Sequence, residues 1–250
     1  MIDLQQFEGI SLAEMEAVKL LNRVDSKYIF HKNTLPEILK ELSPYYSVLE
    51  INQKRTHSYE SLYFDTDDYQ LYYQHHNGKP NRLKVRYRRY SDTGLVFFEV
   101  KKKISNSRTI KYREERVSLN KQLQSIDYQL FNSFLQTSER LQDQLWIYFD
   151  RITLVRKDLA ERLTLDLNLV FQKGNARKFN NGLVVAEIKQ DKGSVFSPVV
   201  QSFRKRHIAQ SNFSKYSVGI ATLEKVKTNS FKPVLLKLGK IIQEPDTPTC

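Results

Sequence analysis

Charged and apolar residues alternate along several short segments, and this alternation constrains the fold more than any other feature of the sequence. In RLKVRYRR every second position holds a basic residue, namely Arg82, Lys84, Arg86 and Arg88. Leucine, valine and tyrosine stand between them. Because successive side chains of a β-strand point to opposite faces of its sheet, the pattern predicts a strand with one cationic face and one apolar face.

The same pattern recurs in four further segments. Their polar sets are Glu99 with Lys101 and Lys103, Lys111 with Arg113, Arg162 with Thr164, Asp166 and Asn168, and Glu187 with Lys189. The third set stands opposite a row made of Leu163, Leu165, Leu167, Leu169 and Phe171. Long apolar rows need cover, which helices can supply from outside if the sheet closes into a barrel with its charged rows inside. About eight strands close a barrel wide enough for a ligand.

The remaining sequence predicts an α+β fold, in which hairpin strands dominate and helices gather at three places along the chain. Period-two segments predict strands at 47–54, 57–65, 82–90, 95–104, 111–119, 144–157, 160–173 and 182–190. Period-3.6 segments with caps predict helices at 11–21, 33–43, 121–136, 196–208 and 214–225, and residues 66–81 are expected to form a polar loop. We expect one domain over residues 1–228 and a tail over 229–250, whose segment 234–242 packs on the barrel or on a membrane.

The net charge of +12 indicates an anionic partner, and the excess positive charge is concentrated in one part of the sequence. Nucleic acid, an acidic membrane surface and a phosphate-rich small molecule are the candidates. The segment from Arg82 to Arg116 carries most of the excess, which favours one site over a diffuse surface. The single cysteine is Cys250 and no apolar run reaches the roughly 18 residues of a membrane span, so a reducing, cytoplasmic location is expected.

Basic residues crowded inside a barrel repel one another unless anions or carboxylates lie between them. Arginine binds phosphate oxygens through its planar fork, and a few carboxylates in such a site suit Mg²⁺ or Mn²⁺. The pattern therefore predicts a ligand with three or more linked phosphates and a divalent metal. An ordinary sheet with one face in water is the simpler interpretation, but the predominance of arginine argues against it.

Nine motifs follow one another in an order typical of a known family. They are RVDSKYIF (23–30), SLYFDT (61–66), KVRYRRY (84–90), FFEVKKK (97–103), IKYRE (110–114), YFDR (148–151), ERLTLDLNL (161–169), AEIKQ (186–190) and FSKYSVG (213–219). Over about residues 5–225 the chain resembles the VTC domain, the polyphosphate polymerase branch of the CYTH-like triphosphate tunnel metalloenzymes. The resemblance implies a closed antiparallel barrel whose tunnel binds ATP and polyphosphate with Mn²⁺ or Mg²⁺.

The resemblance also implies a role for each matched residue. The expected catalytic contacts to phosphate are Lys27, Arg86, Arg88, Lys101, Lys111, Arg151, Arg162 and Lys215. Substrate binding is expected from Lys84, Arg113, Lys189 and Ser214, with Arg113 competing with Lys111 for one tunnel position. Glu187 and Glu99 are the expected metal ligands.

Three functions are compatible with these residues. The first is transfer of the ATP γ-phosphate to a growing polyphosphate chain, with release of ADP and with a separate integral membrane partner conceivable. The second is hydrolysis of inorganic or nucleoside triphosphates by the same tunnel. The third is a basic nucleic-acid-binding module, which predicts an exposed patch and is disfavoured because the basic residues occupy alternate positions of several strands. Asp65 and the many tyrosines are interpreted as a turn cap and as packing residues.

Overall fold

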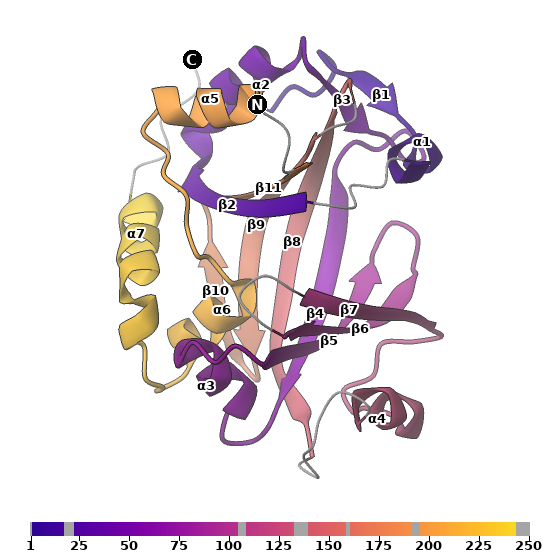
Figure 1. The fold of residues 1–250 in the computed structure, drawn as a ribbon, viewed down its shortest axis with the longest axis vertical. Helices are drawn as coiled ribbons and strands as arrows, with labels where there is room; N and C mark the ends of the chain where they lie inside the picture. The colour runs from indigo at the N-terminus through magenta and orange to yellow at the C-terminus, as the bar shows by residue number, and fades with distance from the viewer. Residues whose placement is uncertain are drawn as a thin grey trace.

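The computed structural model describes residues 2–17, 23–104, 109–132, 140–158, 161–191 and 196–243. Its centre is a sheet with the strand order β2-β11-β9-β8-β4-β5-β6-β7, in which every neighbouring pair is antiparallel (Figure 1). These strands are β2 (Arg23–His31), β4 (His57–Asp65), β5 (Arg82–Tyr90), β6 (Val96–Lys103), β7 (Thr109–Arg116), β8 (Gln142–Arg156), β9 (Glu161–Lys173) and β11 (Leu183–Asp191). Three short strands complete it, namely β1 (Glu8–Ile10), β3 (Tyr46–Leu49) and β10 (Ala176–Asn180).

The sheet has 11 strands and is open, so the prediction of a closed barrel of about eight strands is wrong. Within the described residues, β11 is the only strand paired with β2 and β6 the only one paired with β7, so these two strands end the main strand order. An isolated bridge from Gln210 to Tyr28 covers part of the outer edge of β2. Edge β7 is almost entirely charged after Ile110, a composition that discourages further strand pairing. The sheet is nevertheless strongly curved: in Figure 1, β2 and the β5–β7 group cross in front of the long strands β8 and β9.

Helices lie where the sequence predicts most of them, with shorter bounds. They are α1 (Leu12–Ala17), α2 (Leu35–Leu42), α3 (Gln70–His76), α4 (Ser125–Asn132), α5 (Pro198–Lys205), α6 (Lys215–Leu223) and α7 (Lys232–Gln243). The single-turn helices η1 (Lys32–Thr34) and η2 (Asn229–Phe231) precede α2 and α7. The predicted ends of the helices at 11–21 and 121–136 lie partly outside the described residues.

Helix α3 occupies the middle of the segment predicted as a loop. The buried carboxylate of Asp65 accepts hydrogen bonds from the backbone N–H groups of Leu71 and Tyr72, at 2.8 and 2.9 Å. These are among the N–H groups that the first turn of a helix leaves without partners. Asp65, the last residue of β4, therefore stabilises the first turn of α3. Its partners are six and seven residues further along the chain, and local sequence patterns do not reveal contacts at this separation.

Two apolar clusters cover the convex face of the sheet, as the alternation predicts. One joins β2, β9 and β11 to α2 and α5, through residues such as Leu165, Leu39 and Phe203. The other joins β4, β5 and β6 to the segment around α4, through residues such as Val85 and Leu123. The opposite, concave face of the same strands carries the charged rows.

A third apolar cluster fills one end of the concave face. It contains Ile147 and Phe171 from the sheet together with side chains of α6 and α7, whose buried residues include Val234, Leu238 and Ile241. Helix α7 thus packs on β2 and β11. Across the described ranges of the chain, we find no helix with the length and apolar composition that a membrane span requires.

The predicted row of five apolar residues in β9 is split between the two faces. Leu163, Leu165 and Leu167 belong to the convex cluster, whereas Leu169 and Phe171 belong to the concave one. Between them Asn168 has φ 53°, and the pairing of β9 with β8 shifts register between Tyr148 and Asp150. Such a bulge adds one residue and moves all later side chains to the other face, which the alternation of residue types does not reveal.

Candidate functional site: the charged concave face

Strand register lines up the predicted basic residues in two rows across β5, β6 and β7. Lys84 pairs with Lys101, which pairs with Lys111. One step along the strands, Arg86 pairs with Glu99, which pairs with Arg113. Directly opposite side chains on one face are neighbours, so the first row is a set of three lysines and the second contains a carboxylate between two arginines.

The second row is tightly paired. The Nε atom of Arg86 donates to Oε2 of Glu99 at 2.6 Å, and its Nη1 atom donates to the hydroxyl of Tyr63 at 2.6 Å. Arg113 approaches the other oxygen of Glu99 at 3.7 Å. Burial alone would raise the pKa of Glu99, but the guanidinium groups of Arg86 and Arg88 outweigh it and hold that pKa at about 2.

Two lysines of the first row, Lys84 and Lys101, are not paired in this way. The ammonium group of Lys84 donates to Oγ of Ser214 at 2.9 Å, and no described carboxylate lies within ion-pair distance of Lys84 or Lys101. Burial together with the charges of Lys27 and Lys101 lowers the pKa of Lys84 well below its usual value. Burial and the charges of Lys111 and Lys27 lower the pKa of Lys101 to about 8. Repulsion of this kind is relieved by a bound anion.

Arg88 also has no ion pair among the described residues. Its residue is only 9% exposed, and its Nε atom donates to the hydroxyl of Ser61 at 3.3 Å. Its guanidinium carbon lies 5.6 and 5.9 Å from the ring centres of Tyr59 and Phe149. Aromatic rings and one hydroxyl hold this cation in place, and the nearby charge of Glu99 acts on it without an ion pair.

On the central strands, Arg151 of β8 lies directly opposite Asp166 of β9. Two parallel hydrogen bonds join them, from Nε to Oδ1 at 2.6 Å and from Nη2 to Oδ2 at 2.9 Å. Lys215, the first residue of α6, donates to the same carboxylate. Burial would raise the pKa of Asp166, but the two cations hold it at about 2, and burial lowers the pKa of Lys215 to about 8.

Helix α6 presents Lys215 because of two local features. Ser214 is its N-cap, since the serine hydroxyl accepts a hydrogen bond from the N–H of Ser217 at 3.3 Å. Gly219 allows close contact with the sheet, because a Cβ atom there would lie 2.5 Å from Leu145 and 3.0 Å from Phe171. The helix therefore packs tightly enough to bring its first turn onto the charged face.

The third charged group lies on β2 and β11, where Lys27 pairs directly with Glu187. Lys189, two residues along, donates to the carboxylate of Glu187. Burial would raise the pKa of Glu187, but Lys189 and Lys27 hold it well below its usual range. The Glu187 side chain keeps 24% of its surface exposed, so it is reachable from the solvent within the face.

Arg162 lies at one end of the predicted set of site residues. It pairs with Lys189 in the register of β9 and β11, but its Nη2 atom donates to the carbonyl oxygen of Met15 in α1 at 2.9 Å. This contact places its guanidinium at the end of the face closed by α1. The predicted residues, Arg162 included, all lie on the concave face, and the structure includes both Lys111 and Arg113 there.

Sequence patterns missed the groups that support these cations. Tyr63 accepts from Arg86 and stacks on Tyr216 at a centroid distance of 5.1 Å. The hydroxyl of Tyr216 donates to Asp65, the same carboxylate that stabilises α3. The only local signal for Tyr63 is its position two residues before Asp65 in β4, and the pairing of β4 with β5 is needed to place it beside Arg86.

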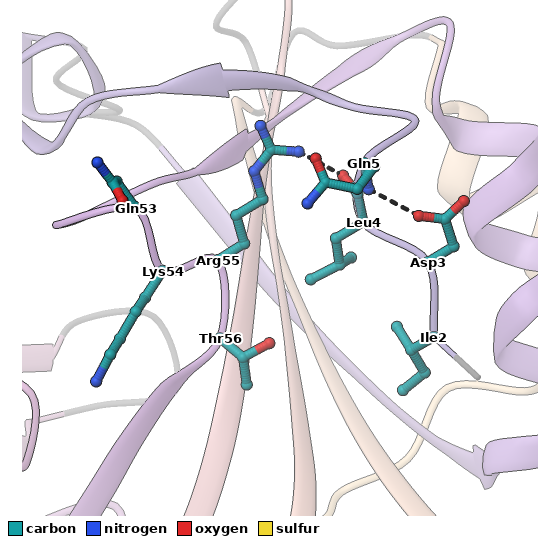
Figure 2. Close-up of a pocket in the computed structure, with 8 residues that line it drawn as sticks. All are labelled: Ile2, Asp3, Leu4, Gln5, Gln53, Lys54, Arg55 and Thr56. Carbon is teal, nitrogen blue, oxygen red and sulfur yellow. Dashed lines mark hydrogen bonds between the residues drawn. The ribbon is translucent and has the colours of Figure 1, made fainter.

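The structure also has a hollow of about 530 Å³ outside this face (Figure 2). It is lined by residues 2–5 and 53–56, and Arg55 inside it donates to the carbonyl oxygens of Leu4 and Phe7 at 2.7 and 3.2 Å. A salt bridge of 2.6 Å to Glu50 completes the pairing of Arg55. None of the lining residues belongs to the charged rows, so this hollow is not part of the candidate site.

Comparison with known proteins identifies the family. The model of the VTC domain matches residues 22–224, which is most of the chain. The chain therefore belongs to the VTC domain family, and the resemblance carried by the nine motifs is confirmed. No curated protein matches the sequence.

The solved structures that match the chain are distant in sequence. One is HpAC1 from Hippeastrum, described as a candidate adenylyl cyclase with a dominant triphosphatase activity, with 14% identity, a TM-score of 0.47 and coverage of 82% of this chain and 97% of that one. Another is PH1819 from Pyrococcus horikoshii OT3, with 13% identity, a TM-score of 0.43 and coverage of 80% and 99%. A third is a candidate adenylate cyclase from Vibrio parahaemolyticus, with 14% identity, a TM-score of 0.44 and coverage of 80% and 98%.

The lowered pKa values predict opposite effects of pH on binding and on stability. Lys101 and Lys215, with pKa values of about 8, lose their protons as the pH rises from 7 to 9.5, so affinity for tripolyphosphate should fall. The unfolded chain keeps these protons up to about 10.5, so in this window it binds more protons than the folded chain. The ligand-free protein should therefore gain stability from these groups over the same window. Calorimetric titration and thermal unfolding at constant ionic strength measure both effects, and an affinity that is constant from pH 7 to 9.5 would contradict this assignment.

Proposed function

We propose that this protein is an ATP-dependent polyphosphate polymerase, which transfers the γ-phosphate of ATP to the end of an inorganic polyphosphate chain and releases ADP. The observation that carries the proposal is a set of cations without a carboxylate partner among the described residues, Lys84, Lys101 and Arg88. They lie on the face where Arg86, Arg113, Arg151, Lys189 and Lys215 are ion-paired. Buried or crowded cations with no counter-ion require an anion, and linked phosphates match a row of them. Membership of the VTC domain family supports the same conclusion.

The chemistry asked of the protein is positioning and charge neutralisation. The terminal oxygen of the acceptor chain attacks the γ-phosphorus, and the bond between this phosphorus and the oxygen bridging it to the β-phosphate breaks, so that ADP leaves with the electron pair. No side-chain nucleophile is needed, because the transition state is stabilised mainly by cations around the transferred group. Arg88 and the lysine row supply this charge, while Glu99 and Asp166 hold Arg86 and Arg151 in fixed orientations.

A divalent metal fits one residue of this face best. Glu187 is ionised and partly exposed, and Mg²⁺ in phosphate sites is commonly held by one or two carboxylates together with the phosphate oxygens of the substrate. When bound, the metal would neutralise phosphate charge. Glu99 fits less well, since its oxygens already contact Arg86 and Arg113. Between residues 2 and 243, the described His, Cys, Asp and Glu side chains form no group of three that could hold a metal ion by themselves.

The two alternative functions are less well supported by the same face. A metal-dependent triphosphatase needs a carboxylate set that orients water, whereas Glu99, Asp166 and Glu187 each contact basic side chains. A nucleic-acid-binding module suits an exposed convex patch, whereas the cations without ion pairs lie on the concave face. A polyanionic acceptor chain fits the excess of basic residues better than water does.

Incubating the purified protein with ATP and Mn²⁺ tests the proposal. We expect ADP to form together with a ladder of phosphate polymers that polyphosphatase digestion removes. Free phosphate in amounts equal to ADP, without polymer, would identify a triphosphatase instead. Absence of any turnover, combined with salt-sensitive binding of RNA or DNA, would support the third function.

A further inference from the structure

Four aromatic residues form a separate, aromatic row on the concave face. On β5 this row begins at Tyr90, the next residue on the same face after Arg88. Phe149, Tyr59 and Tyr90 are directly paired across β8, β4 and β5, and Phe97 of β6 lies beside Tyr90. Their ring centres are 5.1, 4.9 and 5.7 Å apart in this order. Tyr59 and Phe149 are buried, so the accessible end of the row is formed by Tyr90 and Phe97.

Arg113 lies over this accessible end. Its guanidinium carbon is 3.7 Å from the ring centre of Phe97, and its Nη2 atom donates to the hydroxyl of Tyr90 at 3.0 Å. The side chain is 46% exposed although its guanidinium carbon is next to a ring, so part of it is open to the solvent. Phe97 and Tyr90 thus hold a planar cation in a fixed orientation.

The position of this group relative to the charged rows suggests its ligand. Along β6, Phe97, Glu99 and Lys101 share one face, and the first and last of them are about 13 Å apart at the usual rise of a strand. Along β5 the order is Tyr90, Arg88, Arg86 and Lys84. A flat surface therefore stands at one end of a line of cations, as base, sugar and phosphates follow one another in a nucleoside triphosphate.

We propose that Phe97, Tyr90 and Arg113 form a stacking platform for the nucleobase of a nucleoside triphosphate. The base stacks on the guanidinium of Arg113, and the triphosphate extends over Arg88 toward the lysine row. Aromatic rings and arginine planes both stack on bases, with little dependence on which base is present. This inference rests on the proposed function, because it assigns one part of the same ATP site.

Two substitutions separate stacking from charge. Arg113→Lys keeps the positive charge but removes the planar surface, and Phe97→Leu keeps an apolar residue but removes the ring below it. Calorimetric titration with ATP and with tripolyphosphate, both at constant Mg²⁺, measures the two contributions separately. We expect both variants to lose roughly ten-fold in affinity for ATP and less than about two-fold in affinity for tripolyphosphate.

Arg89→Lys is the matched control, since Arg89 is on the same hairpin but pairs with Glu60 at 2.8 Å, and it should change neither affinity. Thermal unfolding of each ligand-free variant checks that its fold is intact. An unchanged ATP affinity in Arg113→Lys, or an equal loss for both ligands, would overturn the platform while leaving the proposed function in place. A wild-type protein that binds neither ligand would refute the proposed function, and the platform with it.

Discussion

Replacing Arg88 by alanine should lower the rate of phosphoryl transfer about a thousand-fold without weakening the fold. The residue has no ion pair among the described side chains, and its neighbours Arg86 and Arg151 repel it. Its charge is therefore available to the transferred phosphoryl group and contributes little to stability. We expect the melting temperature of Arg88→Ala to stay the same or to rise slightly. Steady-state kinetics and thermal unfolding of the variant measure the two effects.

Arg89→Ala provides the comparison on the neighbouring residue. Arg89 alternates with Arg88, so it points to the convex face, where it forms a half-exposed salt bridge with Glu60. Pairs of this kind contribute at most about 1 kcal/mol, and the variant should retain its turnover. If Arg88→Ala retained activity, or lost its fold, Arg88 would be a structural residue and the assignment of the phosphate site to this face would be wrong.

The second large effect is expected on stability, from Asp166→Asn. The Asp166 side chain is 2% exposed and holds both Arg151 and Lys215. Removing its charge leaves two largely buried cations facing each other, and breaking a buried pair in this way costs about 3 kcal/mol or more. For a protein of this size we expect the melting temperature to fall by roughly 6–12 °C. Differential scanning calorimetry measures the change.

Two comparisons make this result specific. Asp158→Asn removes a carboxylate that is 60% exposed and paired with Arg156, and it should cost less than about 1 kcal/mol. Tripolyphosphate should raise the melting temperature of Asp166→Asn more than that of the wild type, because the bound anion replaces part of the lost charge. Equal, small effects of the two substitutions would show that Asp166 does not hold these cations in place.

The sequence was sufficient to predict which residues of a strand share one face, but not which strands pair with one another. Alternation placed Lys84, Arg86 and Arg88 on one face because the side-chain period of a strand is two. It also predicted that helices would cover the opposite, apolar face. Pairing of Glu99 with two arginines depends on the register of three strands, and that register is determined by long-range packing. The same holds for the row of three lysines.

Three features were inaccessible for identifiable physical reasons. Strand β2 was not predicted, because its two faces mix polar and apolar residues: Val24 and Ser26 alternate with Asp25 and Lys27. The bulge at Asn168 changes a backbone angle rather than a residue pattern. Closure of the sheet depends on hydrogen bonds between two distant edges, and the residue pattern of β7 shows which side chains share the concave face but not whether the strand has a second partner.

Arg113 shows how one residue gains a distinct role only in three dimensions. In sequence it competes with Lys111 for a single position, because both lie on the same face of one strand. In the structure Lys111 ends the lysine row, whereas Arg113 rests on Phe97 next to Tyr90. Tyrosine and phenylalanine are common packing residues, so only their alignment across four strands distinguishes a platform from a core.

A crystal structure of the protein with tripolyphosphate and Mn²⁺ tests most directly whether the concave face is the phosphate site. We expect the phosphate oxygens to contact Lys84, Lys101 and Arg88, and the anomalous signal of manganese to lie next to Glu187. Phosphate bound on the convex face, or manganese remote from Glu187, would contradict the assignment of this site.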